Sequence, residues 1–306
     1  MVEIPLPASF TRAVEQSWGP AGRRWLGVLP ALAEQVAQDW ELTLDGRLPL
    51  SMNWVTRARR ADGTPAVLKM GVPEGGHLAD EAAALGFFAG RGAVAVLARD
   101  DARGALLLEE ARPGTPATAL VPADDEAATA ALISVIRRLH RPAPESINLP
   151  ELAGRIASFE QHLDRFPGDD PLPRSLVERG AQVFAELCAT ATERVVLHGD
   201  LHHDNVLAAD REPWLAIDPH GVVGDPGYEV GALLYNPDPQ SPDDGVLDLL
   251  PARIEQLADG LGMPAERVIG WGFAQAVLSE VWTFEGSGKD HMRSLRVAHR
   301  LLPLLP

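Results

Sequence analysis

RVVLHGDLHHDNVLAADREPWLAID, residues 194–218, is the stretch of sequence on which the fold assignment depends. An apolar run leads into a His-Gly-Asp sequence that ends at Asp200, and Asn205 follows before further apolar residues. Another apolar run, Trp214–Ile217, ends in Asp218. The pattern predicts two short strands flanking a turn, with Asn205 and Asp218 at strand ends. A strand end holds a side chain rigidly while still exposing it, so these positions suit a functional site.

The spacing His-x-Asp-x-x-x-x-Asn, followed by a later Asp, suits phosphoryl transfer. This chemistry needs a carboxylate that orients the attacking hydroxyl and accepts its proton. It also needs an amide and a second carboxylate that hold Mg²⁺ on the phosphates. Here the four residues are His198, Asp200, Asn205 and Asp218. A single His-x-Asp is common, but the full spacing between apolar strands is not, and it indicates a phosphotransferase.

Two other interpretations of this stretch stay open. The first is a zinc site of a metallohydrolase, whose ligands would come from His198, His202, His203, Asp200 and Asp204. The order of these residues does not match the His-x-His-x-Asp-His runs of such enzymes, and no convincing distant ligand set is visible. The second is an acidic surface turn, which leaves the apolar residues on both sides unexplained.

The residues before this stretch predict a small sheet. Residues 9–40 have helical periodicity, and Pro20 is placed to open the longer of two helices. The sheet pattern follows from residue 41 to residue 109, with an Asp-Gly hairpin signal at residues 62–63. Its predicted strands are Met52–Arg59, Pro65–Met70, Ala93–Ala98 and Ala105–Leu108, and one helix, His77–Gly90, is inserted among them.

The residues after 109 are mostly helical in pattern. Helices are predicted at residues 124–141, 150–164, 174–190, 226–235, 244–261, 264–284 and 288–301. The chain is therefore expected to be an α+β protein of two lobes. Residues 1–110 would form an N-terminal lobe with an antiparallel sheet, and residues 111–306 a larger helical C-terminal lobe that carries the catalytic loop and the acceptor site.

Composition narrows the classes of partner. The chain has 27 Lys+Arg and 43 Asp+Glu, which gives a net charge of −16. Such an acidic chain is a poor candidate for binding nucleic acid and a better one for collecting cationic ligands. No signal peptide and no apolar run long enough to span a membrane is visible. We therefore expect a cytoplasmic protein without nucleic-acid or membrane partners, monomeric by default.

The quoted stretch resembles a known family. HGDLHHDNVL with the following AIDPHG is similar to the aminoglycoside phosphotransferase superfamily, which has a protein-kinase-like fold. Within it, the likeness is to the streptomycin 6-phosphotransferase (aminoglycoside/hydroxyurea resistance kinase) family. Three further stretches support this narrower match: DGTPAVLKM, ALLLEEARPGT and GDPGYEVGALLYNP. The resemblance covers residues 40–290 and implies a bilobal, protein-kinase-like fold.

The resemblance also implies cofactors and roles. ATP and Mg²⁺ would be the cofactors, Asp200 the catalytic base, and Asn205 and Asp218 the metal ligands. Lys69 would contact the nucleotide phosphates and Glu81 would pair with it, while the backbone of Glu109 and Ala111 would bind the adenine. The loop over the phosphates departs from the family, because DGRLPLSMNW has one glycine where the family is rich in Gly or Ser. Ser51 and Asn53 would donate side-chain hydrogen bonds there instead.

The acceptor is expected to be a small cationic molecule with a hydroxyl, similar to streptomycin with its two guanidinium groups. Carboxylates and aromatic faces recognise guanidinium. The candidate residues are Asp225, Glu229, Glu280, Trp282 and Glu285. Glu280 and Trp282 cannot share one face of a helix. An ATP-dependent small-molecule kinase, a phosphotransferase with an alcohol group as acceptor, is the leading hypothesis. A nucleotide-binding pseudokinase with a degraded phosphate loop and the metallohydrolase are the alternatives.

Overall fold

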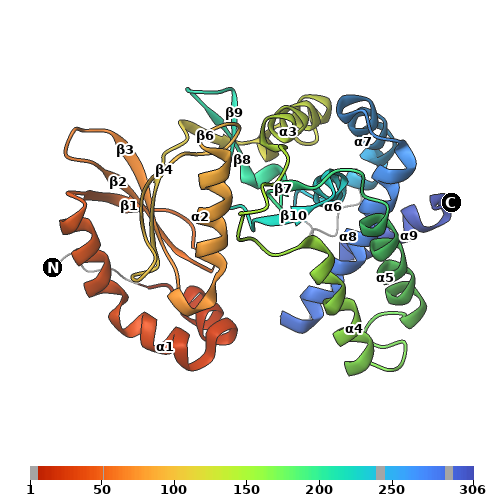
Figure 1. Cartoon of the computed structure of the whole chain (residues 1–306), viewed down its shortest axis with the longest axis horizontal. Coiled ribbons are helices and arrows are strands. Elements are labelled where there is room, and N and C mark those ends of the chain that lie inside the picture. The colour runs from red at the N-terminus through yellow and green to blue at the C-terminus, as the bar shows by residue number, and fades with distance from the viewer. Residues whose placement is uncertain (1–5, 51, 239–244, 287–291) are drawn as a thin grey trace. The chain divides into compact units, whose positions relative to one another are not determined.

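The computed structural model describes residues 6–50, 52–238, 245–286 and 292–306. The chain divides into two compact units. Unit 1 consists of Met1–Gly90 and Val94–Ala111, and unit 2 consists of Arg91–Ala93 and Arg112–Pro306. A five-stranded antiparallel sheet lies in unit 1 and the longer run of helices in unit 2 (Figure 1), so the predicted α+β class is confirmed.

The sheet of unit 1 has the strand order β1-β2-β3-β5-β4, and every neighbouring pair is antiparallel. Its strands are β1 (Thr43–Arg47), β2 (Trp54–Arg59), β3 (Pro65–Met70), β4 (Val96–Asp100) and β5 (Ala105–Glu109). β2 and β3 form the predicted hairpin around Asp62 and Gly63. Strand β4 begins later than expected because Ala93, inside the predicted strand 93–98, pairs with Ala216 of unit 2.

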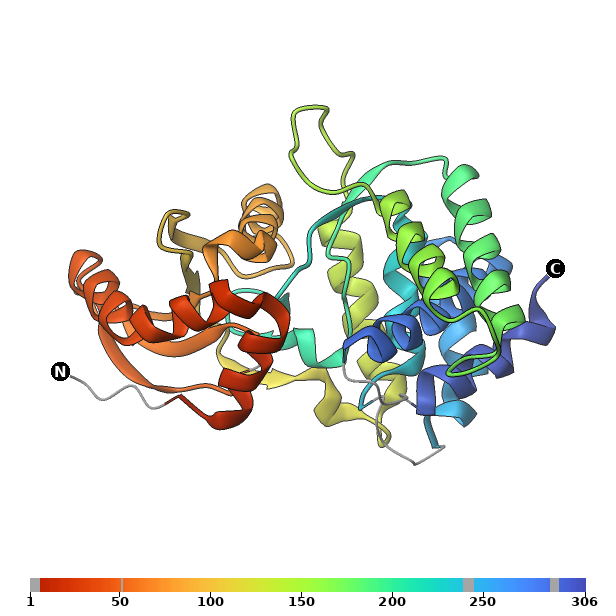
Figure 2. The ribbon, with the colours of Figure 1, turned by 90° about the horizontal axis from the view of Figure 1, so that it is seen from below.

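Helix α1 (Ala8–Asp39) packs on one face of this sheet (Figure 2). Gly19 has φ 49° and ψ −122°, so the helix breaks there and restarts at Pro20, as the sequence predicts. Proline suits the first turn of a helix because its missing N–H has no partner there anyway. Buried residues of α1, including Trp25 and Leu29, share one hydrophobic cluster with Trp54 and Leu68 of the sheet.

The side chains of strand β3 alternate between the two faces of the sheet. Its residues Ala66, Leu68 and Met70 belong to the cluster that contains α1. Successive side chains of a strand point to opposite faces, so Lys69 lies on the other face. Helix α2 (His77–Phe88) supplies the partner of Lys69 on that face. The period of two along β3 thus sets Lys69 apart from the α1 core.

Unit 2 contains two small sheets surrounded by helices. The three-stranded sheet has the order β6-β8-β9, and β10 pairs with β7 in a second sheet. The strands are β6 (Pro113–Pro116), β7 (Val195–Leu197), β8 (Val206–Ala209), β9 (Trp214–Ala216) and β10 (Val222–Gly224). The helices are α3 (Asp125–Leu139), α4 (Ile156–Arg165), α5 (Arg174–Ala189), α6 (Gly231–Tyr235), α7 (Gly245–Leu261), α8 (Ala265–Gly286) and α9 (Met292–Leu301).

One predicted helix of unit 2 takes a different form. Residues 226–235 make a 3₁₀ helix, Pro226–Val230, which continues into the short α6. The Asp225 carboxylate accepts a hydrogen bond from the N–H of Gly227 at 2.7 Å. A carboxylate in this position satisfies an N-terminal N–H that has no partner within the helix. The predicted helices over 244–261 and 288–301 begin at residues that lie outside the described ranges.

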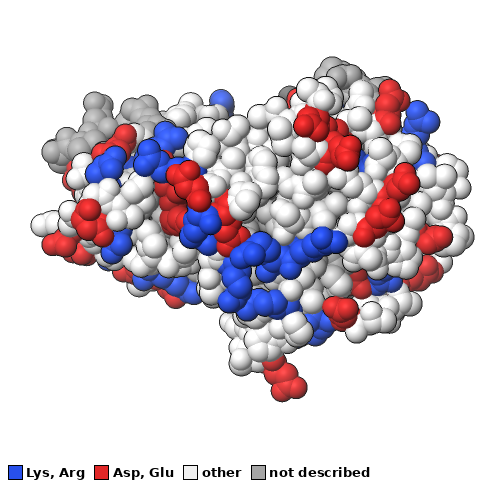
Figure 3. Space-filling model, turned by 90° about the horizontal axis from the view of Figure 1, so that it is seen from above, with Lys and Arg blue, Asp and Glu red and all other residues white. Residues whose placement is uncertain are grey.

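Acidic and basic side chains are interspersed on one face of the molecule. On the face seen in Figure 3, acidic side chains are scattered and a band of Lys and Arg side chains crosses between them. Within unit 2, Glu212 pairs with Arg138 at 2.6 Å and with Arg211 at 3.1 Å. Among the described residues, no helix combines the length and apolar character needed to cross a membrane.

Candidate active site

A closed ring of hydrogen bonds fixes the loop that carries Asp200. The amide Nδ2 of Asn205 donates to the carbonyl of Asp200 at 2.9 Å. The N–H of Ile217 donates to the carbonyl of Asn205 at 2.9 Å. The Nε2 of His198 lies 2.8 Å from the carbonyl of Ile217, and the N–H of Asp200 lies 3.3 Å from Nδ1 of His198. The ring therefore sets the backbone at Asp200 and Asn205 and at the residue preceding Asp218.

His198 belongs to this ring as a neutral imidazole. Its Nδ1 accepts from the N–H of Asp200, so the ring hydrogen is on Nε2 and donates to the carbonyl of Ile217. Complete burial lowers its pKa. A neutral, buried His198 serves the geometry of the loop and holds no proton for transfer.

A buried carboxylate holds the same loop from its other side. Oε2 of Glu229 accepts from the N–H of His198 and Oε1 from the N–H of Gly199, both at 2.8 Å. Burial would raise the pKa of Glu229, but the nearby imidazole of His140 and the N–H of Gly199 hold it below the ordinary value. Glu229 thus remains a carboxylate that fixes the loop.

The carboxylate of Asp200 is half-buried, with two imidazoles near it. Nε2 of His202 and Nε2 of His220 each lie 3.7 Å from Oδ2 of Asp200. These distances are too long for hydrogen bonds. With 36% of its side-chain surface exposed, Asp200 can accept a hydrogen bond from an incoming hydroxyl.

Asn205 and Asp218 have the donor atoms that suit Mg²⁺. Because Nδ2 of Asn205 donates within the ring, its Oδ1 is the atom left for a cation. Asp218 has φ 58°, a left-handed conformation that non-glycine residues adopt rarely and that is held here by the adjoining ring. An amide oxygen and a carboxylate fit Mg²⁺, which binds oxygen ligands and keeps water and phosphate in its shell.

The described part of the chain contains no group of three or more His, Cys, Asp or Glu side chains arranged to hold a metal ion. His203, one of the residues considered for zinc, is fully buried, and neither ring nitrogen has a hydrogen-bond partner. Burial, and then the positive charge of Arg253, lower the pKa of His203 to about 2. A neutral His203 is part of the packing beneath the loop.

We predict a pH-dependent stability from His203. The folded protein leaves this residue neutral, whereas the unfolded chain protonates it below its ordinary pKa of 6.5. The unfolding free energy then falls as the pH falls below 6.5, by about 1.4 kcal/mol per pH unit for one histidine. Between pH 6.5 and 5, the unfolding free energy of wild type, measured with urea, should therefore fall by about 2 kcal/mol more than that of His203→Leu. Parallel curves of unfolding free energy against pH for the two proteins would contradict this prediction. The control is His299→Leu, which removes an exposed histidine and should follow the pH dependence of wild type.

In unit 1, Lys69 and Glu81 form a buried ion pair. Nζ of Lys69 lies 2.6 Å from Oε2 of Glu81, and the two residues are 3% and 4% exposed. Strand β3 supplies the lysine and helix α2 the glutamate. A lysine buried in this way is held in one position, as a group that contacts nucleotide phosphates must be. The structure therefore brings together the two residues paired by the resemblance, and their contact with nucleotide stays a prediction.

The other predicted nucleotide residues lie elsewhere in unit 1. Ser51 falls outside the described residues. Asn53 lies close to Gly71, and its Oδ1 occupies the space that a Cβ atom at residue 71 would need. The bulky Trp54 of the same loop sequence packs into the α1 core. The N–H of Glu109 donates to the carbonyl of Ala95 at 2.9 Å, so a contact of adenine with this N–H would need that bond to open. Ala111 is the last residue of unit 1.

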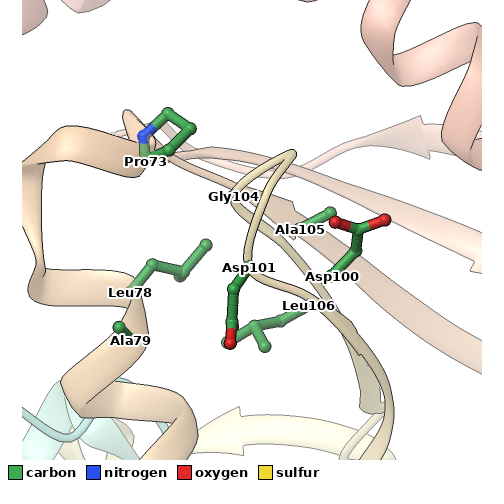
Figure 4. Close-up of a pocket in the computed structure, with 8 residues that line it drawn as sticks. All are labelled: Pro73, Leu78, Ala79, Asp100, Asp101, Gly104, Ala105 and Leu106. Atoms are coloured by element: carbon green, nitrogen blue, oxygen red, sulfur yellow. The ribbon is translucent and has the colours of Figure 1, made fainter.

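A small pocket of unit 1 is lined by none of these residues. It is lined by Pro73, Leu78, Ala79, Asp100, Asp101, Gly104, Ala105 and Leu106 (Figure 4). Arg103 donates to both oxygens of Asp100, through its N–H at 3.0 Å and Nε at 2.7 Å. Asp100 therefore holds the β4–β5 turn, and we assign no function to this pocket.

Three of the five residues predicted to bind the acceptor are buried. Asp225, Glu229 and Glu280 are 3%, 1% and 0% exposed. Asp225 accepts from the N–H of Gly227 and from Nε1 of Trp271 at 3.0 Å, and pairs with Arg267. Glu280 accepts from the N–H of Leu295 at 3.2 Å. In this structure these carboxylates bind other groups of the protein and expose almost no surface to an acceptor.

Trp282 and Glu285 are the predicted acceptor residues that keep exposed surface. Trp282 is 37% exposed, and its Nε1 donates to Oγ of Ser158 at 2.9 Å. Glu285 is half-buried, and burial raises its pKa. The assignment to acceptor binding stays a prediction for both residues.

Sequence reasoning missed two residues near Asp200. Arg155 contacts the carbonyl of Gly199 at 3.1 Å, although 44 residues separate them and no motif surrounds Arg155. Tyr235 is buried, and burial and then the nearby charge of Asp200 raise its pKa. The sequence carries no signal for either contact, because both depend on tertiary packing.

A sheet unit with a buried Lys-Glu pair and a helical unit with a His-x-Asp-x-x-x-x-Asn loop define a kinase of the protein-kinase-like class. The family model for aminoglycoside/hydroxyurea antibiotic resistance kinases matches residues 40–287. The chain belongs to this family, and the predicted assignment to it is confirmed. The enzyme is a phosphotransferase that acts on a hydroxyl group, and the match favours neither the metallohydrolase nor the pseudokinase.

Individual relatives agree with the family. The chain is 35% identical to a streptomycin 6-kinase of Streptomyces glaucescens over 93% of its length and 92% of that protein. It is 33% identical to a hydroxyurea phosphotransferase of Kitasatospora aureofaciens over 98% of its length and 86% of that protein. Among solved structures, choline kinase LicA of Streptococcus pneumoniae shares the fold, with a TM-score of 0.64, 14% identity, and 90% and 98% of the two chains covered. The protein-kinase-like fold is thereby confirmed.

Proposed function

We propose that the protein transfers the γ-phosphoryl group of ATP to a hydroxyl of a streptomycin-like aminoglycoside. The observation that carries the proposal is the hydrogen-bonded ring that fixes Asp200 and Asn205 and the backbone next to Asp218. Asp200 orients the acceptor hydroxyl and accepts its proton. Relatives named for streptomycin phosphorylation, at 35% identity, support the choice of acceptor class.

Lys69 would contact the nucleotide phosphates from unit 1, held by Glu81. Asn205 and Asp218 would hold Mg²⁺, which neutralises charge on the phosphates when bound. Catalysis would then come chiefly from positioning, because phosphoryl transfer requires little covalent chemistry from the protein. The protein is still predicted to be monomeric and to act in the cytoplasm.

Hydroxyurea is a second candidate acceptor. A hydroxyurea phosphotransferase is 33% identical over 98% of the chain, and hydroxyurea also presents a hydroxyl. The two candidates differ in charge, since streptomycin carries guanidinium groups and hydroxyurea does not. A carboxylate at the acceptor site, for which Glu285 is the remaining candidate, would matter for streptomycin and not for hydroxyurea.

The test is ADP release with Mg·ATP, measured in parallel for streptomycin, other aminoglycosides, hydroxyurea and no acceptor. We expect streptomycin to raise the rate of ADP release above the rate without acceptor. This increase should require Mg²⁺. Stimulation by hydroxyurea alone would move the assignment to the second candidate. No stimulation by any member of this set would contradict the proposed function.

A further inference from the structure

Arg155 reaches the catalytic loop from the start of helix α4. Its Nη1 donates to the carbonyl of Gly199 at 3.1 Å and to the hydroxyl of Tyr228. Its guanidinium carbon lies over two aromatic rings, 5.0 Å from the centroid of Tyr228 and 5.2 Å from that of Trp282. Guanidinium groups are attracted to aromatic faces at such distances. Arg155 is therefore held in place from several directions.

The group that Arg155 binds is the peptide directly before Asp200. Glu229 accepts from the N–H of Gly199 at 2.8 Å, and Arg155 donates to the carbonyl of the same residue. Both hydrogen bonds involve a charged partner, which makes them stronger than neutral ones. Gly199 has φ 83°, a conformation that glycine adopts easily and that the two bonds select here. The two contacts fix the peptide groups on both sides of Gly199, the second of which leads directly into Asp200.

Trp282 connects this arrangement to the surface. It is the aromatic residue predicted to contact the acceptor, and 37% of it is exposed. Its Nε1 donates to Ser158 of α4 at 2.9 Å, so the indole ring is held over Arg155. Contacts thus run from the exposed Trp282 through Arg155 to Gly199 and the reacting carboxylate.

We propose that Arg155 is a positioning residue, which orients Asp200 through the Gly199 carbonyl and couples acceptor contact at Trp282 to turnover. The inference rests on the proposed function and deepens it. The contacts of Arg155 described above are not with Lys69 or the metal ligands, so its loss is expected to slow the reaction more than it weakens nucleotide binding. A displaced catalytic group commonly costs one or two orders of magnitude in rate, even where binding is unchanged.

The test compares Arg155→Met and Arg155→Lys with wild type. Methionine is also a long unbranched side chain but has no donor, whereas lysine keeps the charge and N–H donors on a single ammonium group. We expect Arg155→Met to lower kcat about 10- to 100-fold and to change KM for Mg·ATP less than about twofold. Arg155→Lys should recover part of kcat. Arg174→Lys is the matched control, because Arg174 also donates to backbone carbonyls of unit 2, those of Leu163 and Pro167.

A coupled effect is expected for Trp282. Trp282→Leu should also lower kcat, and the double variant with Arg155→Met should lose less than the product of the two single losses. Independent, multiplicative losses would contradict the coupling through Arg155.

Hydrogen exchange separates this inference from the proposed function, because it needs no acceptor. Residues 198–201 should exchange faster in Arg155→Met than in wild type, with unchanged exchange in Arg174→Lys. A wild type that phosphorylates no acceptor would defeat the proposed function, and the exchange comparison would still decide the role of Arg155. Unchanged exchange at residues 198–201, or a kcat of Arg155→Met within about twofold of wild type, would overturn the positioning role.

Discussion

Replacing Asp200 with alanine is expected to remove phosphoryl transfer while nucleotide still binds. Asp200 lies in unit 2, where its backbone is fixed by Asn205 and His198, and its carboxylate is the group available to an acceptor hydroxyl. A positioned general base contributes on the order of 10²- to 10⁴-fold to rate, so kcat should fall by about that factor. The dissociation constant for Mg·ATP, measured by calorimetric titration, should stay near that of wild type.

The matched control is Asp210→Ala, which removes an exposed aspartate from the β8–β9 turn of the same unit. It should leave kcat unchanged. Near-normal turnover of Asp200→Ala would show that another group orients the hydroxyl. A parallel loss of nucleotide affinity would instead place Asp200 among the metal ligands.

Removal of Lys69 is expected to affect both stability and nucleotide binding. Lys69→Ala leaves the carboxylate of Glu81, 4% exposed, without its cation. Breaking a buried ion pair by removing one partner costs about 3–5 kcal/mol. The unfolding free energy in urea should fall by that amount, and the affinity for Mg·ATP should fall because a contact with the phosphates is lost.

A double variant separates the structural role of Lys69 from its functional role. Lys69→Met with Glu81→Leu replaces both charges by apolar groups of similar size, which is often neutral for stability. We expect it to recover most of the lost stability and none of the nucleotide affinity. Restored affinity in the double variant would show that Lys69 does not contact the phosphates.

The exposed pair Arg24 and Glu74 of unit 1 provides the control. Its atoms lie 3.8 Å apart and its side chains are 68% and 62% exposed. Exposed pairs contribute about 0–1 kcal/mol, so Arg24→Ala should change stability and nucleotide affinity little.

Much of the fold could be predicted because its signals are local. The Asp-Gly turn predicts the β2–β3 hairpin, Pro20 predicts the second part of α1, and the quoted stretch predicts β8 and β9. Strand β6, Pro113–Pro116, was not predicted, because a Pro-Gly-Thr-Pro sequence has no strand pattern. It forms because β8, far along the chain, pairs with it.

The residues of the candidate site also differ in whether local sequence could predict them. Asp200, Asn205 and Asp218 could be chosen from spacing, since neighbouring residues of one loop and two strands hold them. Glu229 and Glu280 are different, because sequence does not distinguish an exposed carboxylate from one that is buried against backbone N–H groups. Their environment is created by packing between distant segments. The same is true of Arg155, whose partners lie 44 and 73 residues away.

The most direct test of the central claim is to identify the product. Streptomycin is incubated with the full-length protein, ATP and Mg²⁺, and the acceptor is analysed by mass spectrometry and ³¹P NMR, with Asp200→Ala in parallel. The account predicts an acceptor that has gained one phosphoryl group as an ester on a hydroxyl, one ADP for each ester, and no ester with Asp200→Ala. ATP consumed with the acceptor unmodified, or equal ester formation by Asp200→Ala, would contradict it.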